Sequence, residues 1–224
     1  MEMREAMLHL LLKQPFYGYV AASVTVEESE DIATLKMQND SALVLQYNRK
    51  WYESLSYEKA IGVIIHELLH IILLHPYRRE GRNMLLWTVA CDMAVNEHIP
   101  VEFLPDNSIT VETVAREIGE RIPGYRSAEY YYDVISASES QFSFFERKDD
   151  IRIVTGSGDE FSANKQMEDE ASEINKNALK CMMSELIEQA QFEGEIPGKV
   201  SSIIADIYKS DSVNWRNVLR RFLT

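Results

Sequence analysis

Hydrophobic residues gather most densely between Ala60 and Leu74, where ten of the fifteen positions are Ile, Leu or Val. They cover all sides of a helix, and a helix that is apolar all round is buried. Ser56 is suited to cap its first turn. Pro76 is expected to end it, because the residue before a proline is pushed out of the helical region. The pattern therefore predicts one buried central helix.

The stretches before this helix are predicted to form a helix and then a small sheet. Residues 1–13 have a helical pattern that stops before Pro15. Residues 17–26, 32–37 and 42–47 are rich in β-branched and aromatic side chains, which favours three strands of an antiparallel or mixed sheet. The last strand is predicted to lie at the edge of the sheet, where an extended peptide can pair with it.

Beyond Pro76 the chain is predicted to be helical apart from one insertion. The expected helices span residues 84–99, 111–119, 127–135, 168–192, 200–208 and 215–223. Residues 136–170 are rich in Ser, Asp, Glu and Gly, which is typical of a flexible acidic insertion. We therefore expect a mostly helical α+β fold, with a single domain over residues 1–224 that ends in a helical segment at 171–224.

The composition argues against several classes of partner. The 224 residues carry a formal net charge of -13, whereas binding to nucleic acid or to anionic membranes needs clustered Lys and Arg. Cys91 and Cys181 lie far apart in the sequence, so a disulfide framework is not expected. The N-terminus lacks the basic and apolar regions of a signal peptide. We expect a cytoplasmic protein that binds neither nucleic acid nor membrane.

The buried helix contains the H-E-x-x-H pattern, written here as His66-Glu67-Leu68-Leu69-His70. A helix advances about 100° per residue, so residues four apart lie on one face. His66 and His70 can therefore bind one Zn²⁺. Glu67 is placed beside them, and is predicted to take a proton from a water molecule on the metal.

A catalytic zinc site needs a third protein ligand and one open position, and Asp92 is the favoured candidate for that ligand. It follows His70 by 22 residues and lies in an apolar stretch, where an unpaired carboxylate is costly. His75 is the main alternative, although a continued helix would turn it about 140° away from His70. Glu97 and His98 remain as further alternatives.

Neighbouring residues have other expected roles. Asn96 lies one helical turn after Asp92 and is placed to orient a ligand or to bind the substrate backbone. His75, if it is not a ligand, is expected to orient one or to lie at the helix end. Cys91 is a conceivable soft ligand, but it would point about 100° away from Asp92, which favours a place in the core.

These motifs together resemble a known family. Leu55-Ser56, the H-E-x-x-H pattern, His75, Arg78 and the downstream run from Trp87 to Asn96 resemble the metallopeptidase domain found beside von Willebrand factor A-like domains in bacteria and phages. The run Ala90-Cys91-Asp92-Met93-Ala94-Val95-Asn96 is the part specific to that family. Further resemblance lies at residues 15–18, 45–48, 127–131, 194–198 and 214–223.

The resemblance implies a zincin-like fold, a zinc ion on His66, His70 and Asp92, and hydrolysis of a peptide or protein substrate through Glu67. It also implies a von Willebrand factor A-like domain or protein as a partner. The alternative function is a zinc-binding adaptor without catalysis, which works with such a partner and an ATPase. A closed zinc site with four protein ligands would favour that alternative.

Overall fold

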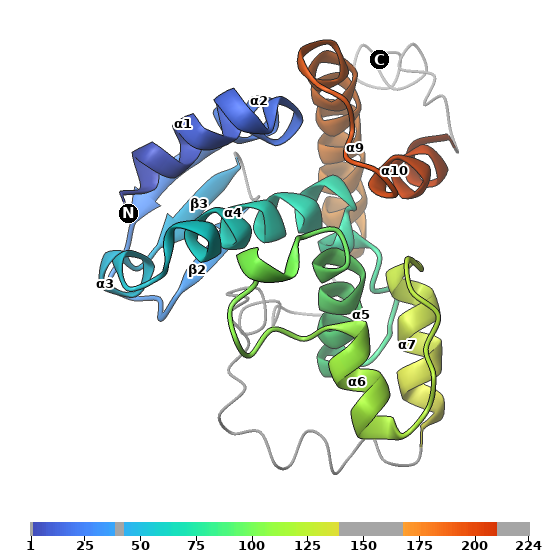
Figure 1. The fold of residues 1–224 in the computed structure, drawn as a ribbon. Coiled ribbons are helices and arrows are strands. Elements are labelled where there is room, and N and C mark those ends of the chain that lie inside the picture. Colours follow the sequence, from blue (N-terminus) through green and yellow to red (C-terminus); the bar gives the residue numbers. More distant parts are fainter. Residues whose placement is uncertain (1, 39–42, 139–167, 210–224) are drawn as a thin grey trace, which may run out of the picture.

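The chain folds mainly into helices, with one small mixed sheet, which is an α+β fold (Figure 1). The computed structural model describes residues 2–38, 43–138 and 168–209, with the side chains of the last range described for residues 176–208. The elements before the central helix are α1 (Met3–Lys13), α2 (Pro15–Ala22), β1 (Thr25–Glu28), β2 (Leu35–Gln38), β3 (Val44–Tyr47) and α3 (Arg49–Glu53). The later elements are α4 (Tyr57–Ile72), η1 (His75–Tyr77), α5 (Met84–Asn96), η2 (Val101–Phe103), α6 (Val111–Ile118), α7 (Ala128–Ala137), α9 (Glu168–Glu193) and α10 (Val200–Lys209), where η marks a short 3₁₀ turn.

The sheet has the strand order β1-β3-β2, with β1 parallel and β2 antiparallel to β3. The sheet is therefore mixed, which is one of the two arrangements expected. One expectation was wrong, because the strand expected at 42–47 lies in the centre of the sheet instead of at its edge. Its backbone groups already pair on both sides, so it cannot accept a further strand. Among the described residues, the edges of the sheet are β1 and β2.

The strand expected at 17–26 was also wrong in its first half, which forms the helix α2. Pro15 does not merely stop α1, because it occupies the first turn of α2, where a missing N–H costs nothing. Gly18 lets the two helices approach closely, since a Cβ there would collide with the backbone of Leu11. The apolar run is thus buried by helix packing, and only Thr25–Glu28 forms the first strand.

The central helix α4 begins as expected but ends earlier. The Ser56 side chain accepts a hydrogen bond from the Lys59 N–H and caps the first turn. The helix ends at Ile72, before Pro76, because Leu74 adopts the left-handed conformation with φ 54°. The chain then turns back through η1, which contains Pro76. This early turn changes where His75 lies.

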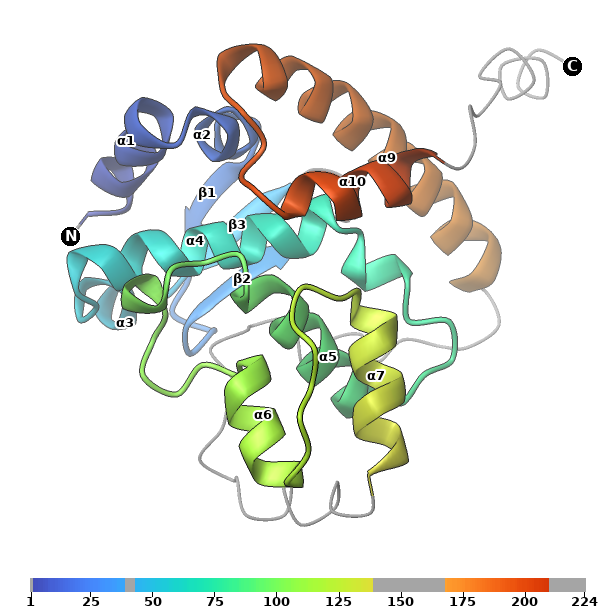
Figure 2. The same ribbon diagram turned by 45° about the vertical axis from the view of Figure 1, so that its right-hand side comes forward.

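Two clusters of buried apolar side chains lie on either side of α4. The first joins α1, α2, the sheet, α4, α9 and α10, and the second joins α5, α6 and α7. Figures 1 and 2 show α1 and α2 above α4, and α5, α6 and α7 below it. The two clusters thus meet where α4 packs against α5, and Val95 of α5 belongs to the first cluster. His66, Glu67, His70 and Asp92 come from these two helices.

Other expectations meet the structure in part. The helices expected at 84–99, 111–119, 127–135, 168–192 and 200–208 are present, with ends that differ by a few residues. Most of the acidic insertion expected at 136–170, and the whole helix expected at 215–223, lie outside the described residues. None of the described helices is both long enough and apolar enough to cross a membrane.

Candidate metal centre

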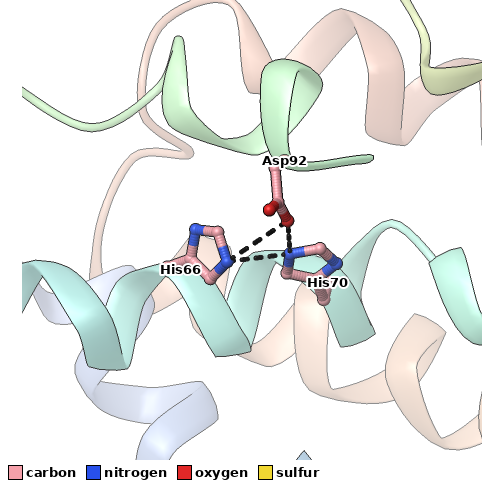
Figure 3. A group of neighbouring side chains, drawn as sticks. All are labelled: His66, His70 and Asp92. Carbon is pink, nitrogen blue, oxygen red and sulfur yellow. Dashed lines mark hydrogen bonds and ion pairs between the residues drawn. The ribbon is translucent and has the colours of Figure 1, made fainter. Parts of the chain in front are cut away.

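Three side chains from α4 and α5 converge on one point, as Figure 3 shows. The Nε2 atoms of His66 and His70 lie 3.0 Å apart, and the Asp92 Oδ1 atom lies 3.6 Å from the first and 3.3 Å from the second. Ligand atoms about 2.0–2.1 Å from a tetrahedral zinc ion are about 3.3–3.4 Å apart. The observed triangle therefore has the size that such an ion requires.

The proton on His66 is assigned by its second contact. Its Nδ1 lies 2.8 Å from the Asn96 Oδ1, and the amide of Asn96 is oriented by a 2.7 Å hydrogen bond from its Nδ2 to the Ile109 carbonyl. The oxygen of Asn96 must then accept, so Nδ1 of His66 carries the proton and donates. The Nε2 atom is left with a lone pair that faces His70 and Asp92.

The proton on His70 follows from its contact with His75. The two Nδ1 atoms lie 3.2 Å apart. When Nδ1 of His70 donates to His75, Nε2 of His70 also presents a lone pair to the triangle. The backbone carbonyl of His75 accepts from Nε1 of Trp87 at 3.1 Å, which holds this residue in place. His75 thus contacts a predicted ligand from behind and is not part of the convergent group.

With Nδ1 of each histidine protonated, three acceptor atoms face one another in a buried space. Asp92 Oδ1 has no hydrogen-bond partner among the described residues, and Asp92 is only 1% exposed. Burial raises the pKa of Asp92 to about 7 and lowers the pKa values of His66 and His70 to about 4. Such a group of acceptors without a donor is costly unless a cation joins it, so the residues fit a metal ion.

Glu67 lies on α4 next to these residues and is equally buried. Its Oε2 accepts a hydrogen bond of 3.3 Å from the Met37 N–H on strand β2, whereas its Oε1 has no partner among the described residues. Burial, and then the charge of Asp92, raise the pKa of Glu67 to about 8. One oxygen is thus oriented by the sheet and the other is left to accept a proton.

The other predicted candidates lie apart from the triangle. Glu97 accepts hydrogen bonds from the Tyr125 N–H and the Tyr131 hydroxyl, so its carboxylate joins the end of α5 to α7 and to the segment before it. His98 packs against the ring of Tyr125. Cys91 is buried in the cluster of α5, α6 and α7. None of these three belongs to the His66, His70 and Asp92 group found among the described residues.

A narrow pocket lies beside the convergent group. His66 and Asp92 form part of its wall, and the segment from Leu104 to Ile109 forms another part. Neither this segment nor Met37 was predicted from the sequence. Their residue types give no signal of a functional role, because they contribute only backbone groups and packing surface. Their closeness to α4 depends on the fold.

Comparisons with known proteins place the chain in a family. A family model with the description "Putative metallopeptidase domain" matches residues 1–224. A Thermotoga maritima protein with the name "Uncharacterized protein" is 29% identical over 103 residues, which are 44% of this chain. The matched stretch covers 26% of that relative. No solved structure matches.

Proposed function

We propose that this chain, which belongs to the family described as "Putative metallopeptidase domain", is a zinc-dependent peptidase with a zincin-like fold. The observation that carries the proposal is the convergence of three buried acceptor atoms beside a buried glutamate with one free oxygen. Two imidazoles and one carboxylate form a donor set typical of catalytic zinc, which keeps one coordination position open. His66, His70 and Asp92 would hold the ion.

The chain's own residues supply the proton transfers in this proposal. When bound, zinc supplies Lewis acidity, which acidifies water and polarises a carbonyl oxygen. Oε1 of Glu67 accepts a proton from the attacking water and returns it to the leaving amine nitrogen. The hydrogen bond from Met37 to Oε2 orients the carboxylate for both steps. Asn96 and His75 orient the two imidazoles.

The edge of β2 is the proposed docking site for the peptide backbone. In the antiparallel pair of β2 and β3, alternate residues turn their backbone groups away from the partner strand. The Thr34 carbonyl accepts from the Asn48 N–H, and Met37 donates to Glu67, so Leu35 and Met37 are the residues that turn outward. An extended peptide that pairs with this edge would pass Glu67.

Zinc content and hydrolysis of unfolded casein, measured on the same preparations, test the proposal. Wild type and Glu67→Gln are each expected to hold about one zinc per chain, because Glu67 is not a proposed ligand. Hydrolysis should fall by about 10²–10⁴-fold in Glu67→Gln. Glu58→Gln, an exposed change on the same helix, should cleave as wild type does. Undiminished hydrolysis in Glu67→Gln would overturn the mechanism.

The adaptor alternative predicts a different result, namely stoichiometric zinc without cleavage of any peptide. A closed site with four protein ligands would support it. Cys91 lies in another cluster and His75 contacts the far nitrogen of His70, so neither supplies a fourth ligand in the arrangement described. A von Willebrand factor A-like partner is compatible with either function.

A further inference from the structure

We propose that the narrow pocket beside the metal centre receives the substrate side chain next to the cleaved bond and accepts only small, uncharged ones. This inference rests on the proposed peptidase function and specifies its substrate class. The pocket adjoins the metal centre, because His66 and Asp92 belong to both. A peptide whose carbonyl lies at the centre would therefore present a neighbouring side chain to the pocket.

The lining determines which side chain fits. Val63, Leu104 and Ile109 supply buried apolar surface, and Val63 is only 3% exposed. Of the described residues that line the pocket, only Asp92 has a formal charge, and it is a proposed metal ligand. A charged substrate side chain would lose its hydration here without gaining a partner. The pocket therefore favours uncharged side chains.

The size of the pocket sets a second limit. Its free space is about 20 Å³, and a single water molecule needs about 10–15 Å³ by the same measure. The hydrogen, methyl and hydroxymethyl groups of Gly, Ala and Ser fit such a space, whereas Leu and Phe side chains require the walls to move. We therefore expect Gly, Ala or Ser at this position of the substrate.

Three contacts hold the outer wall of the pocket, residues 104–109, and the adjoining η2 against α4 and α5. Gly62 packs so closely under η2 that a Cβ would collide with the Phe103 carbonyl. Lys59 on α4 forms an ion pair of 2.5 Å with Asp106. The Asn96 amide donates to the Ile109 carbonyl. In both views the connection between α5 and α6 runs beside α4 (Figures 1 and 2). The pocket cannot widen without loss of these contacts, so the packing of the segment against the helices limits the size of the pocket.

Cleavage sites mapped by mass spectrometry in digests of unfolded casein test the inference. Wild type should cut where Gly, Ala or Ser occupies one fixed position next to the bond. Val63→Ala enlarges the pocket, so the ratio of cleavage with Leu to cleavage with Ala should rise by about tenfold or more. Val101→Ala is the matched control, because Val101 is 79% exposed on η2 and does not line the pocket. It should leave the cleavage pattern unchanged.

A second variant makes the pocket smaller. Ser108→Val on the outer wall adds bulk, and should reduce cleavage with Ala relative to Gly by about tenfold. This loop position remains available if Val63→Ala does not fold. A wild type that prefers Leu or Phe at both flanking positions would overturn the inference, as would an unchanged preference in the variants that fold.

A binding measurement separates this inference from the proposed function. Zinc-loaded Glu67→Gln is titrated by calorimetry with hexapeptides that differ only in Gly, Ala, Ser, Leu or Phe at the mapped position. The small residues should bind at least about tenfold more tightly than Leu and Phe. Equal affinities in a wild type that cleaves would reject the pocket alone. A zinc-loaded wild type that cleaves no peptide would reject the peptidase function itself.

Discussion

The carboxylate oxygen Oδ1 of Asp92 lies 3.3 Å from Nε2 of His70, although 22 residues separate the two in the sequence. His70 belongs to α4, and Asp92 to α5, so the contact joins two helices that pack into different apolar clusters. The candidate metal centre thus depends on how these two clusters meet. A cation at this point would also hold them together, which couples metal binding to stability.

Replacement of Asp92 by Ala should weaken zinc binding. It should also remove an unfavourable contribution to the stability of the metal-free protein, namely the burial of an unpaired carboxylate. Loss of the proposed third ligand is expected to reduce zinc affinity by at least about 100-fold, measured by competition with a chelator. The metal-free variant should unfold at the same or a higher temperature than metal-free wild type at pH 8, because a buried carboxylate without a partner is removed. Asp133→Ala, an exposed change on α7, serves as the control. A markedly lower unfolding temperature in Asp92→Ala would mean that the carboxylate stabilises the fold without a metal.

Replacement of His75 by Ala should weaken zinc binding without removing the site. Nδ1 of His75 contacts Nδ1 of His70 and does not face the triangle, so the variant should still bind one zinc per chain at saturation. Its affinity should fall by about 10–100-fold, because the ring of His70 loses the contact that orients it. Chelator competition measures the affinity, and mass spectrometry measures the stoichiometry. Less than one zinc at saturation would instead make His75 a ligand.

The metal-free protein should lose stability between pH 6.5 and pH 8. Burial raises the pKa of Asp92 to about 7 and the pKa of Glu67 to about 8, whereas both groups titrate near pH 4 when the chain is unfolded. The folded state therefore holds more protons in this window, and the free energy of unfolding falls as the pH rises. The buried histidines oppose part of this trend. Burial lowers the pKa values of His66, His70 and His98 to about 4, whereas an unfolded histidine titrates near pH 6.5 and still holds protons up to about pH 7.5.

The expected net loss is about 1 kcal/mol over this window after the opposing contribution of the histidines, and Glu67 accounts for most of the loss. Urea unfolding at several pH values with a chelator present measures it. Glu67→Gln should flatten the dependence, while Glu58→Gln should leave it as in wild type. A free energy of unfolding that rises toward pH 8 in metal-free wild type would contradict the assignment of these raised pKa values.

Replacement of Gly62 by Ala should destabilise the protein by about 1–3 kcal/mol, because the added Cβ collides with the Phe103 carbonyl. Thermal unfolding measures the effect. Gly81→Ala provides a contrast, because a Cβ there meets no atom and only the positive φ opposes the change. A Gly62→Ala protein as stable as wild type would show that η2 can move away from α4, and would remove one of the contacts that hold the pocket narrow.

The sequence by itself determined the elements and the chemistry that depend on local spacing. The apolar run and Ser56 predicted α4, because periodicity and capping act within one helix. The four-residue spacing placed His66 and His70 on one face for the same reason. Asp92 could be favoured as their companion because a carboxylate in an apolar stretch needs a partner. That argument depends only on the burial of an apolar stretch, and it can be made without knowledge of the fold.

Only the tertiary structure decided which of these parts meet. The strand order, the contact from Met37 to Glu67 and the pocket wall from Leu104 to Ile109 all depend on segments that are distant in sequence. The position of His75 behind His70 depends on an irregular turn of the chain. Hydrophobic patterning states that a face is buried, but many partners satisfy an apolar face equally well. The choice among them depends on how side chains interlock across the whole core, and local spacing does not contain that information.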